Sequence, residues 1–196
     1  MKKTRANAMK RAGDAAKPKR QSAVAERPGS WHLARTETER RLSDFEFRLE
    51  RLAQAYYRWK ASCLAAVCDV PLTGDDVAVL NVVRMGDEPK RLSEIGQLLN
   101  RVDVPNLQYA TRKLVRSGLI ETEGSSSRKE TRYRATATGR SVTEAYAALR
   151  SATLLPMLDA LDGWVEKSET ASIHLDLLSS LYAQAAQVAI TRRHQP

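Results

Sequence analysis

The fold of this 196-residue chain is decided by residues 104–118, which read Val104-Pro105-Asn106-Leu107-Gln108-Tyr109-Ala110-Thr111-Arg112-Lys113-Leu114-Val115-Arg116-Ser117-Gly118. Five of them recur at the spacing of one helical face and predict its buried side: Val104, Leu107, Ala110, Thr111 and Leu114. Asp103 can cap the free amides at the start, and Pro105 is tolerated in a first turn, where its missing N–H costs nothing. The stretch therefore predicts a helix over residues 104–117, closed by Gly118.

The other face of this predicted helix carries hydrogen-bonding side chains of the kinds that read base edges or hold phosphates. They are Asn106, Gln108, Tyr109, Arg112, Lys113 and Arg116. A merely solvated polar face is the alternative interpretation. We expect these side chains to contact DNA.

The neighbouring segments predict a helix-turn-helix followed by a strand pair. Upstream, Thr73 is a candidate cap for a helix ending near Gly86, and the apolar residues of 92–99 share one helical face that stops at Asn100. Downstream, residues 119–123 and 131–136 alternate as strands around a basic tip. In such a winged helix-turn-helix, one helix fits the major groove and the wing reaches the neighbouring backbone or minor groove.

Helices are also predicted before and after this domain. From Leu42 to Cys63 the apolar positions keep a 3-4-3-4 spacing for three heptads, which is typical of a long helix with one narrow seam. A core helix inside one subunit is the alternative, but a seam of this length beside a small basic domain favours a dimer. The chain returns to helix at residues 138–141, with a division at Pro156 and a last helix near residues 172–190.

The expected fold class is mainly α with a small β-hairpin wing, in which a winged helix-turn-helix DNA-binding lobe is joined to a helical dimerisation domain. The expected parts are a disordered basic tail (1–30), a long dimerisation helix (31–70), the winged helix DNA-binding domain (71–140) and C-terminal helices that complete the dimerisation domain (141–196).

Positive charge is concentrated in two segments of the chain. Residues 1–30 hold nine Lys/Arg and two acidic residues, a net +7, and residues 89–140 hold eleven and five, a net +6, whereas the remainder is −4. A polyanion such as double-stranded DNA is therefore the expected partner. The tail is either a polybasic arm that adds phosphate contacts or a solubilising leader.

The sequence gives no support to an enzyme, a metal protein or a membrane protein. His32, His174 and His194 lie far apart, so no catalytic residues, metal ligands or cofactor are predicted. The acidic pair Asp75-Asp76 is expected to favour the positive end of a helix dipole rather than to act as an acid and base. The longest uncharged apolar stretch has 14 residues and no secretory signal is recognised, so no membrane association and a cytoplasmic location are expected.

The order of elements resembles the MarR family of transcriptional regulators. The resemblance is carried by Arg91-Leu92-Ser93-Glu94-Ile95, by residues 107–120, where the predicted recognition helix leads into Gly118-Leu119, and by Ala135-Thr136-Ala137-Thr138-Gly139-Arg140. It implies a homodimer that acts on a pseudo-palindromic operator as a sequence-specific repressor. The chain departs from the family at Ala135, where leucine is usual, and in its wing, which lacks the common Asp-x-Arg pattern, so only Arg128 and Lys129 are carried over as wing contacts.

The resemblance also implies two means of regulation. Tyr56, Tyr57 and Trp59 could line a pocket for a small aromatic or phenolic effector that releases the DNA, or could equally be core residues. Cys63 or Cys68 could sense oxidants, although buried structural thiols are more common. A winged-helix module that binds proteins without touching DNA is the alternative from another functional class.

Overall fold

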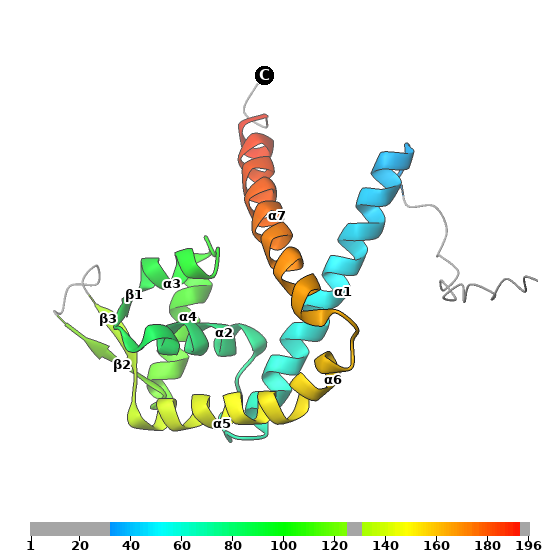
Figure 1. Cartoon of the computed structure of the whole chain (residues 1–196). Helices are drawn as coiled ribbons and strands as arrows, with labels where there is room; N and C mark the ends of the chain where they lie inside the picture. The colour runs from blue at the N-terminus through cyan, green and yellow to red at the C-terminus, as the bar shows by residue number, and fades with distance from the viewer. Residues whose placement is uncertain (1–31, 125–130, 193–196) are drawn as a thin grey trace, which may run out of the picture. The chain divides into compact units, whose positions relative to one another are not determined.

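The computed structural model describes residues 32–124 and 131–192, and the chain divides into two compact units, Met1–Arg48 and Leu49–Pro196. The boundary falls inside the first helix. The helices are α1 (Glu37–Ala65), α2 (Gly74–Arg84), α3 (Leu92–Leu98), α4 (Val104–Arg116), α5 (Ala137–Thr153), α6 (Leu155–Asp159) and α7 (Trp164–Arg192), and the strands are β1 (Lys90–Arg91), β2 (Ile120–Glu123) and β3 (Arg132–Ala135) (Figure 1).

The helix α2 begins at a cap that the sequence identified. The Thr73 hydroxyl accepts a hydrogen bond from the Asp76 N–H (3.2 Å), and the Asp76 carboxylate accepts one from the Thr73 N–H (2.9 Å). This reciprocal capping box satisfies two amides that the helix itself leaves without partners. It fixes the point at which the chain turns into α2.

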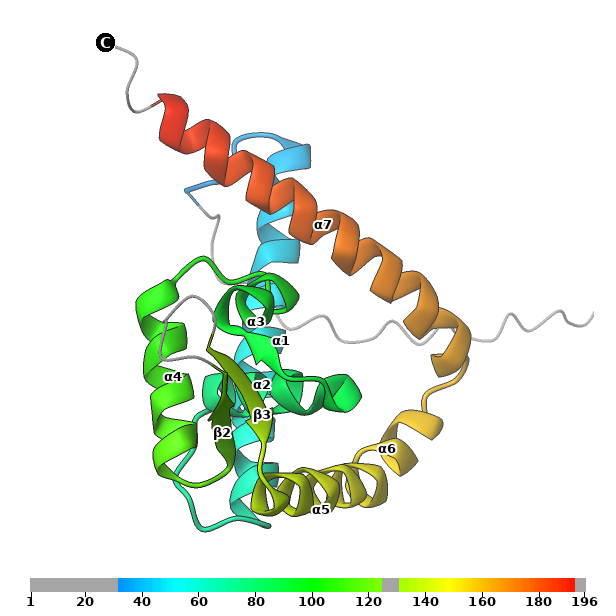
Figure 2. The same ribbon diagram turned by 90° about the vertical axis from the view of Figure 1, so that its left-hand side faces the viewer.

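Three antiparallel strands form a small sheet in the order β1-β3-β2. The hairpin of β2 and β3 pairs Thr122 with Tyr133, while β1 adds Lys90 opposite Tyr133 on the other edge of β3. The sequence predicted the hairpin but not β1, because a strand of two residues has no alternation to recognise. Figure 2 shows the β2–β3 pair beside α4.

The core of the winged helix is built around α2. Val77, Val79 and Leu80 are completely buried, and they pack with residues from α3, α4 and the start of the hairpin. Burying a side chain of this size stabilises a fold by about 1.5–3 kcal/mol, so this cluster holds α3 and α4 in place. Other buried members are Val83, Ile95, Leu107, Ala110, Leu114, Leu119 and Ile120.

The hairpin returns into α5 through a close backbone contact. Thr136 caps α5 by accepting a hydrogen bond from the Gly139 N–H (3.0 Å). A Cβ at Gly139 would lie 1.9 Å from the Leu119 carbonyl oxygen, so only glycine fits at this position. Gly139, one of the residues that carry the resemblance, therefore lets the start of α5 pack against Leu119, which lies between α4 and β2.

The expected winged helix-turn-helix, mainly helical with a small β-hairpin, is confirmed. The helix divides near Pro156 as expected, since α5 ends at Thr153 and the short α6 follows, but α7 begins at Trp164, earlier than the sequence indicated. Two local expectations were wrong. Val104 is half exposed rather than part of the core, because it lies in the first turn, ahead of the buried face. Asp103 stands at the cap position of α4 without bonding to its amides through its side chain.

Large apolar side chains remain exposed on the long helices. On α1, Leu42, Leu52 and Tyr56, three of the predicted seam positions, are at least half exposed. The helix α7 has no buried residue although its sequence is rich in apolar side chains. Its exposed apolar residues include Val165, Ile173, Leu175, Leu177, Leu181, Tyr182, Val188 and Ile190.

Candidate nucleic-acid interface

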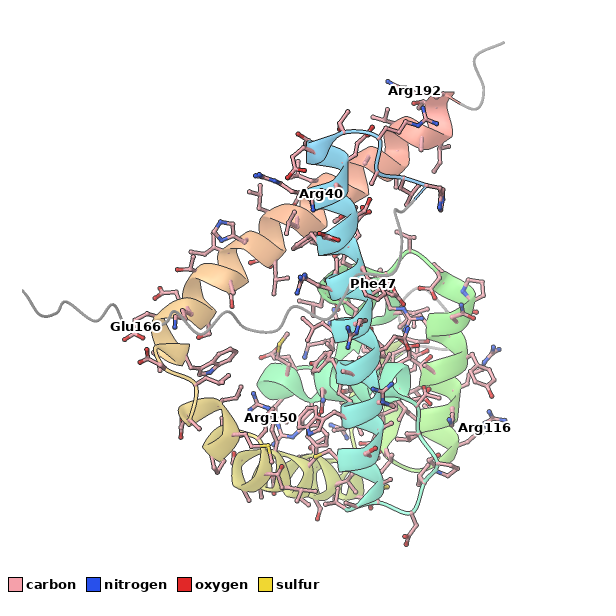
Figure 3. The ribbon with its side chains drawn as sticks, turned by 90° about the vertical axis from the view of Figure 1, so that its right-hand side faces the viewer. Arg40, Phe47, Arg116, Arg150, Glu166 and Arg192 are labelled. Carbon is pink, nitrogen blue, oxygen red and sulfur yellow. The ribbon has the colours of Figure 1, made fainter. Side chains whose placement is uncertain are left out.

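The helix α4, which the sequence predicts to be the recognition helix, separates its apolar and polar residues onto opposite faces. Leu107, Ala110, Thr111 and Leu114 are buried against the core, as predicted. The opposite face presents Tyr109, which is 57% exposed, together with the exposed side chains of Asn106, Arg112 and Arg116 and the half-buried Gln108. Figure 3 shows Arg116 projecting outward from α4. A helix that is rigidly held on one face and carries cations and hydrogen-bonding groups on the other has the properties needed to enter a major groove.

The structure places Lys113 differently from the other predicted contacts. Its ammonium group binds the Asp76 carboxylate of α2, with 2.7 Å between Lys113 Nζ and Asp76 Oδ2. The Asp76 side chain is only 5% exposed and that of Lys113 is 21% exposed. The charge of Lys113 is therefore directed at α2, and its contact with DNA stays a prediction. The helical period alone could not show this, since a lysine at the edge of a polar face suits either partner.

A second ion pair stands at the start of α4. The Arg101 guanidinium binds Asp103 with two hydrogen bonds, of 2.9 Å from Nε and 2.6 Å from Nη2. These bonds, with a further one from Asn106, hold the pKa of the Asp103 carboxyl well below its usual range. Asp103 therefore remains a carboxylate that anchors Arg101, and it orients Asn106 at the first turn of the helix.

A groove lies between α4 and the hairpin. It has a volume of about 510 Å³, and the side chains of α4 meet Thr122 of β2 and Tyr133 of β3 across it. Its other lining residues are Tyr109, Arg112, Val115 and Arg116. Thr122 and Tyr133 were not predicted as site residues, although they lie opposite each other in the paired strands. Arg128 and Lys129, the expected wing contacts, lie outside the described residues.

The three expected effector residues are neighbours, since Tyr56 meets Tyr57 edge to face at 6.1 Å between ring centroids, but only two of them line a cavity. Tyr56 and Trp59 stack at 6.3 Å between ring centroids, and Trp59 also contacts Tyr146 of α5. Tyr57 also has the Lys60 ammonium 3.7 Å from its ring centroid, and its backbone packs against Gly74.

Tyr56 and Trp59, without Tyr57, line a cavity of about 440 Å³. Burial raises the pKa of Tyr146, which also lines it, to about 12, so its phenol stays protonated. The remaining lining residues are Asn81, Arg84, Thr143, Glu144, Ala147, Arg150 and Leu154.

Both cysteines are free thiols, Cys63 buried and Cys68 half-buried. Burial raises the pKa of the Cys63 thiol, which keeps it protonated at neutral pH. A reactive cysteine needs the opposite shift. In the part of the chain that the structure describes, no cluster of His, Cys, Asp and Glu could hold a metal ion. None of the helices there is both long enough and apolar enough to span a membrane.

Comparison with known proteins defines the class of the domain. A family model described as a winged helix DNA-binding domain matches residues 72–139. Those residues therefore form a winged helix DNA-binding domain, which contains α4. No curated protein matches the chain in sequence.

Solved structures extend the similarity beyond this domain. Reduced AbfR bound to DNA, a protein known from Staphylococcus epidermidis, superposes with a TM-score of 0.61 at 19% identity, covering 76% of this chain and 98% of AbfR. A MarR family transcription regulator gives 0.59 at 18% identity, covering 75% and 93%. The transcriptional repressor CouR, bound to a 23-mer DNA duplex, gives 0.56 at 22% identity, covering 70% and 94%. The chain has the fold of MarR-family regulators, and the resemblance seen in its sequence is confirmed.

Proposed function

We propose that this protein is a MarR-type transcription regulator that binds a pseudo-palindromic double-stranded DNA operator as a homodimer and represses transcription. The observation that carries the proposal is the exposed face of α4, where Tyr109, Arg112 and Arg116 stand beside the hairpin groove. Arg and Tyr on a helix of this kind supply both base-edge and phosphate contacts. AbfR and CouR, which share the fold, were each solved bound to DNA, and this supports the same use here.

The proposed DNA contacts are the polar side chains of α4 that face away from the core and the hairpin side chains beside them. Asn106, Gln108, Tyr109, Arg112 and Arg116 come from α4, and Thr122 and Tyr133 join them from the hairpin. Arg128 and Lys129 remain proposed wing contacts on their sequence position alone.

The homodimer is supported by the exposed apolar residues of α1 and α7. A helix as apolar as α7 is stable in water only when that surface is covered. Two copies of the chain provide such cover if α1 and the C-terminal helices form the interface. A dimer also places two recognition helices about one helical turn apart on DNA, which is what a pseudo-palindromic operator requires.

Selection from a random pool of DNA duplexes tests this function directly. We expect an inverted repeat to be enriched, and we expect its affinity to fall steeply with salt, by a slope of about −0.9 per phosphate contacted. The competing hypothesis, a winged-helix module that binds only proteins, predicts no enriched sequence and a flat response to salt. Either of these two results would refute the proposed function.

We also propose release of the DNA by a small aromatic or phenolic effector bound in the 440 Å³ cavity. Arg84 lines this cavity together with the rings of Tyr56, Trp59 and Tyr146. Arg84 Nε is buried without a hydrogen-bond partner among the described residues. A buried donor in this state costs about 1–3 kcal/mol, and an acceptor group on a ligand would remove that cost.

The effector proposal predicts that phenol or benzoate dissociates the protein–DNA complex, and that Tyr56→Ala weakens this response. Tyr56 is also an exposed position of the predicted α1 seam, so the DNA affinity of the variant without ligand is measured first and its ligand response is expressed relative to that value. Fluorescence anisotropy of labelled operator DNA during a ligand titration measures both quantities. Identical titration curves for the wild-type and Tyr56→Ala proteins would refute the assignment of this cavity.

The redox alternative named Cys63 or Cys68; Cys68, a half-buried free thiol, stays a candidate, whereas Cys63 has less support. The Cys63 thiol is buried and its Sγ lies 3.9 Å from the Tyr146 carbonyl oxygen, with its pKa raised rather than lowered. It therefore resembles a packed structural thiol more than a sensor.

A further inference from the structure

The acidic pair Asp75-Asp76 at the start of α2 has a role that the helix dipole does not explain. The Asp76 carboxylate lies between two helices rather than in solvent. Its Oδ2 atom accepts hydrogen bonds from the Thr73 N–H (2.9 Å), the Thr73 hydroxyl (3.0 Å) and the Lys113 ammonium (2.7 Å). Removing the charged partner of a buried carboxylate is strongly unfavourable, so this contact ties α2 to α4 firmly.

The neighbouring Asp75 makes a second connection to the same helix. Its Oδ1 accepts a hydrogen bond from Arg101 Nη1 at 3.3 Å. The same guanidinium holds Asp103, the residue that precedes the first turn of α4. Asp75 therefore reaches the start of α4, and Asp76 reaches Lys113 in its last turns.

These two anchors constrain the orientation of the recognition helix. Asp103 and Lys113 are ten residues apart, which is about 15 Å along a helix. One contact at each end limits tilting, and the position of Lys113 on the side of the helix limits rotation. The rotation of α4 decides where Arg112 and its neighbours on the outer face point. Base-edge hydrogen bonds weaken steeply when misaligned, whereas attraction to phosphates does not depend on such alignment.

We propose that Asp75 and Asp76 are positioning residues that set sequence specificity, acting through Arg101 and Lys113 without touching DNA. The proposal rests on the proposed DNA-binding function and explains how α2 participates in it. The competing explanation is that Lys113 neutralises a DNA phosphate. The two explanations differ in measurable ways, because a phosphate contact contributes equally to all sequences and to the salt slope.

The test compares operator and random duplexes over a range of salt concentrations for four variants of the full chain: Lys113→Met, Asp76→Asn, the double variant, and Thr73→Ala. We expect each of the first two to lose at least tenfold in operator affinity and less than twofold on random DNA, with an unchanged salt slope. The double variant should be no worse than the poorer single variant, because both remove one contact.

Thr73→Ala is the matched control for loss of stability. It removes the hydroxyl of the capping box and weakens α2, but it keeps the Asp76–Lys113 pair. Its melting temperature should fall while its ratio of operator to random affinity stays that of the wild type. If Asp76→Asn does not fold, Asp75→Asn replaces it, since that side chain is 55% exposed, and it should lower the ratio about threefold.

Three results would overturn the inference. The first is a salt dependence of DNA affinity that is weaker by about 0.9 in slope for Lys113→Met. The others are equal losses of affinity for operator and random duplexes, or wild-type specificity in the Asp76→Asn variant. The sequence preference of the wild-type protein distinguishes failure of the positioning role from failure of the proposed DNA-binding function. If the wild type prefers no sequence, both are wrong. If it does and the variants keep its preference, only the positioning role is wrong.

Discussion

Replacing Arg112 with alanine is expected to weaken binding to the selected operator by about 10- to 100-fold, the cost of losing one bidentate contact to a base. Arg112 is exposed on the outer face of α4 and also lines the groove beside the hairpin. It forms no ion pair with the described residues, so its guanidinium is available to DNA. Its removal should not unfold the domain, because the buried face of α4 is untouched.

Arg48→Ala on α1 is the matched control, since it removes the same charge from an exposed helical position outside the winged helix domain. Fluorescence anisotropy with labelled operator DNA at constant salt compares the two variants. If Arg112→Ala binds as tightly as Arg48→Ala, then α4 is not the recognition helix and the proposed interface is wrong.

Much of the fold could be predicted because its signals are local. The Thr73 cap, the stop at Asn100 and the division near Pro156 each depend on the conformational preferences of one residue and its near neighbours. Asn100 indeed adopts a positive φ of 50°, one residue beyond the Leu99 cap that ends α3. The buried face of α4 followed equally from a short-range spacing. Features of this kind need no knowledge of tertiary contacts.

The parts that could not be predicted depend on residues far apart in the chain. The pair of Lys113 with Asp76 spans 37 positions, and the hydrogen bond from the Arg132 side chain to the Pro89 carbonyl spans 43. In sequence, Lys113 is simply one more cation on a polar helix. Only the packing of α2 against α4 shows that its charge is directed at Asp76.

Replacing Leu52 with glutamate is expected to convert the protein from a dimer to a monomer and to weaken operator binding by at least 100-fold. Leu52 is 61% exposed on α1, so a single chain can accommodate a charge there at little cost. In the proposed interface, the same carboxylate would be buried without a partner, a penalty of several kcal/mol. A monomer must bind each half-site separately, and it loses the gain of 10²–10⁴ that linking two binding modules provides.

Gln54→Glu provides the control, because it introduces the same charge two residues further along α1, on the opposite side from Leu52. Sedimentation equilibrium should give a dimer mass for the wild type and for Gln54→Glu, and a monomer mass for Leu52→Glu with an unchanged helical circular dichroism spectrum. A wild-type monomer at micromolar concentration would contradict the dimer. A dimeric Leu52→Glu variant would instead show that the α1 seam lies outside the interface, and α7 alone would then have to supply it.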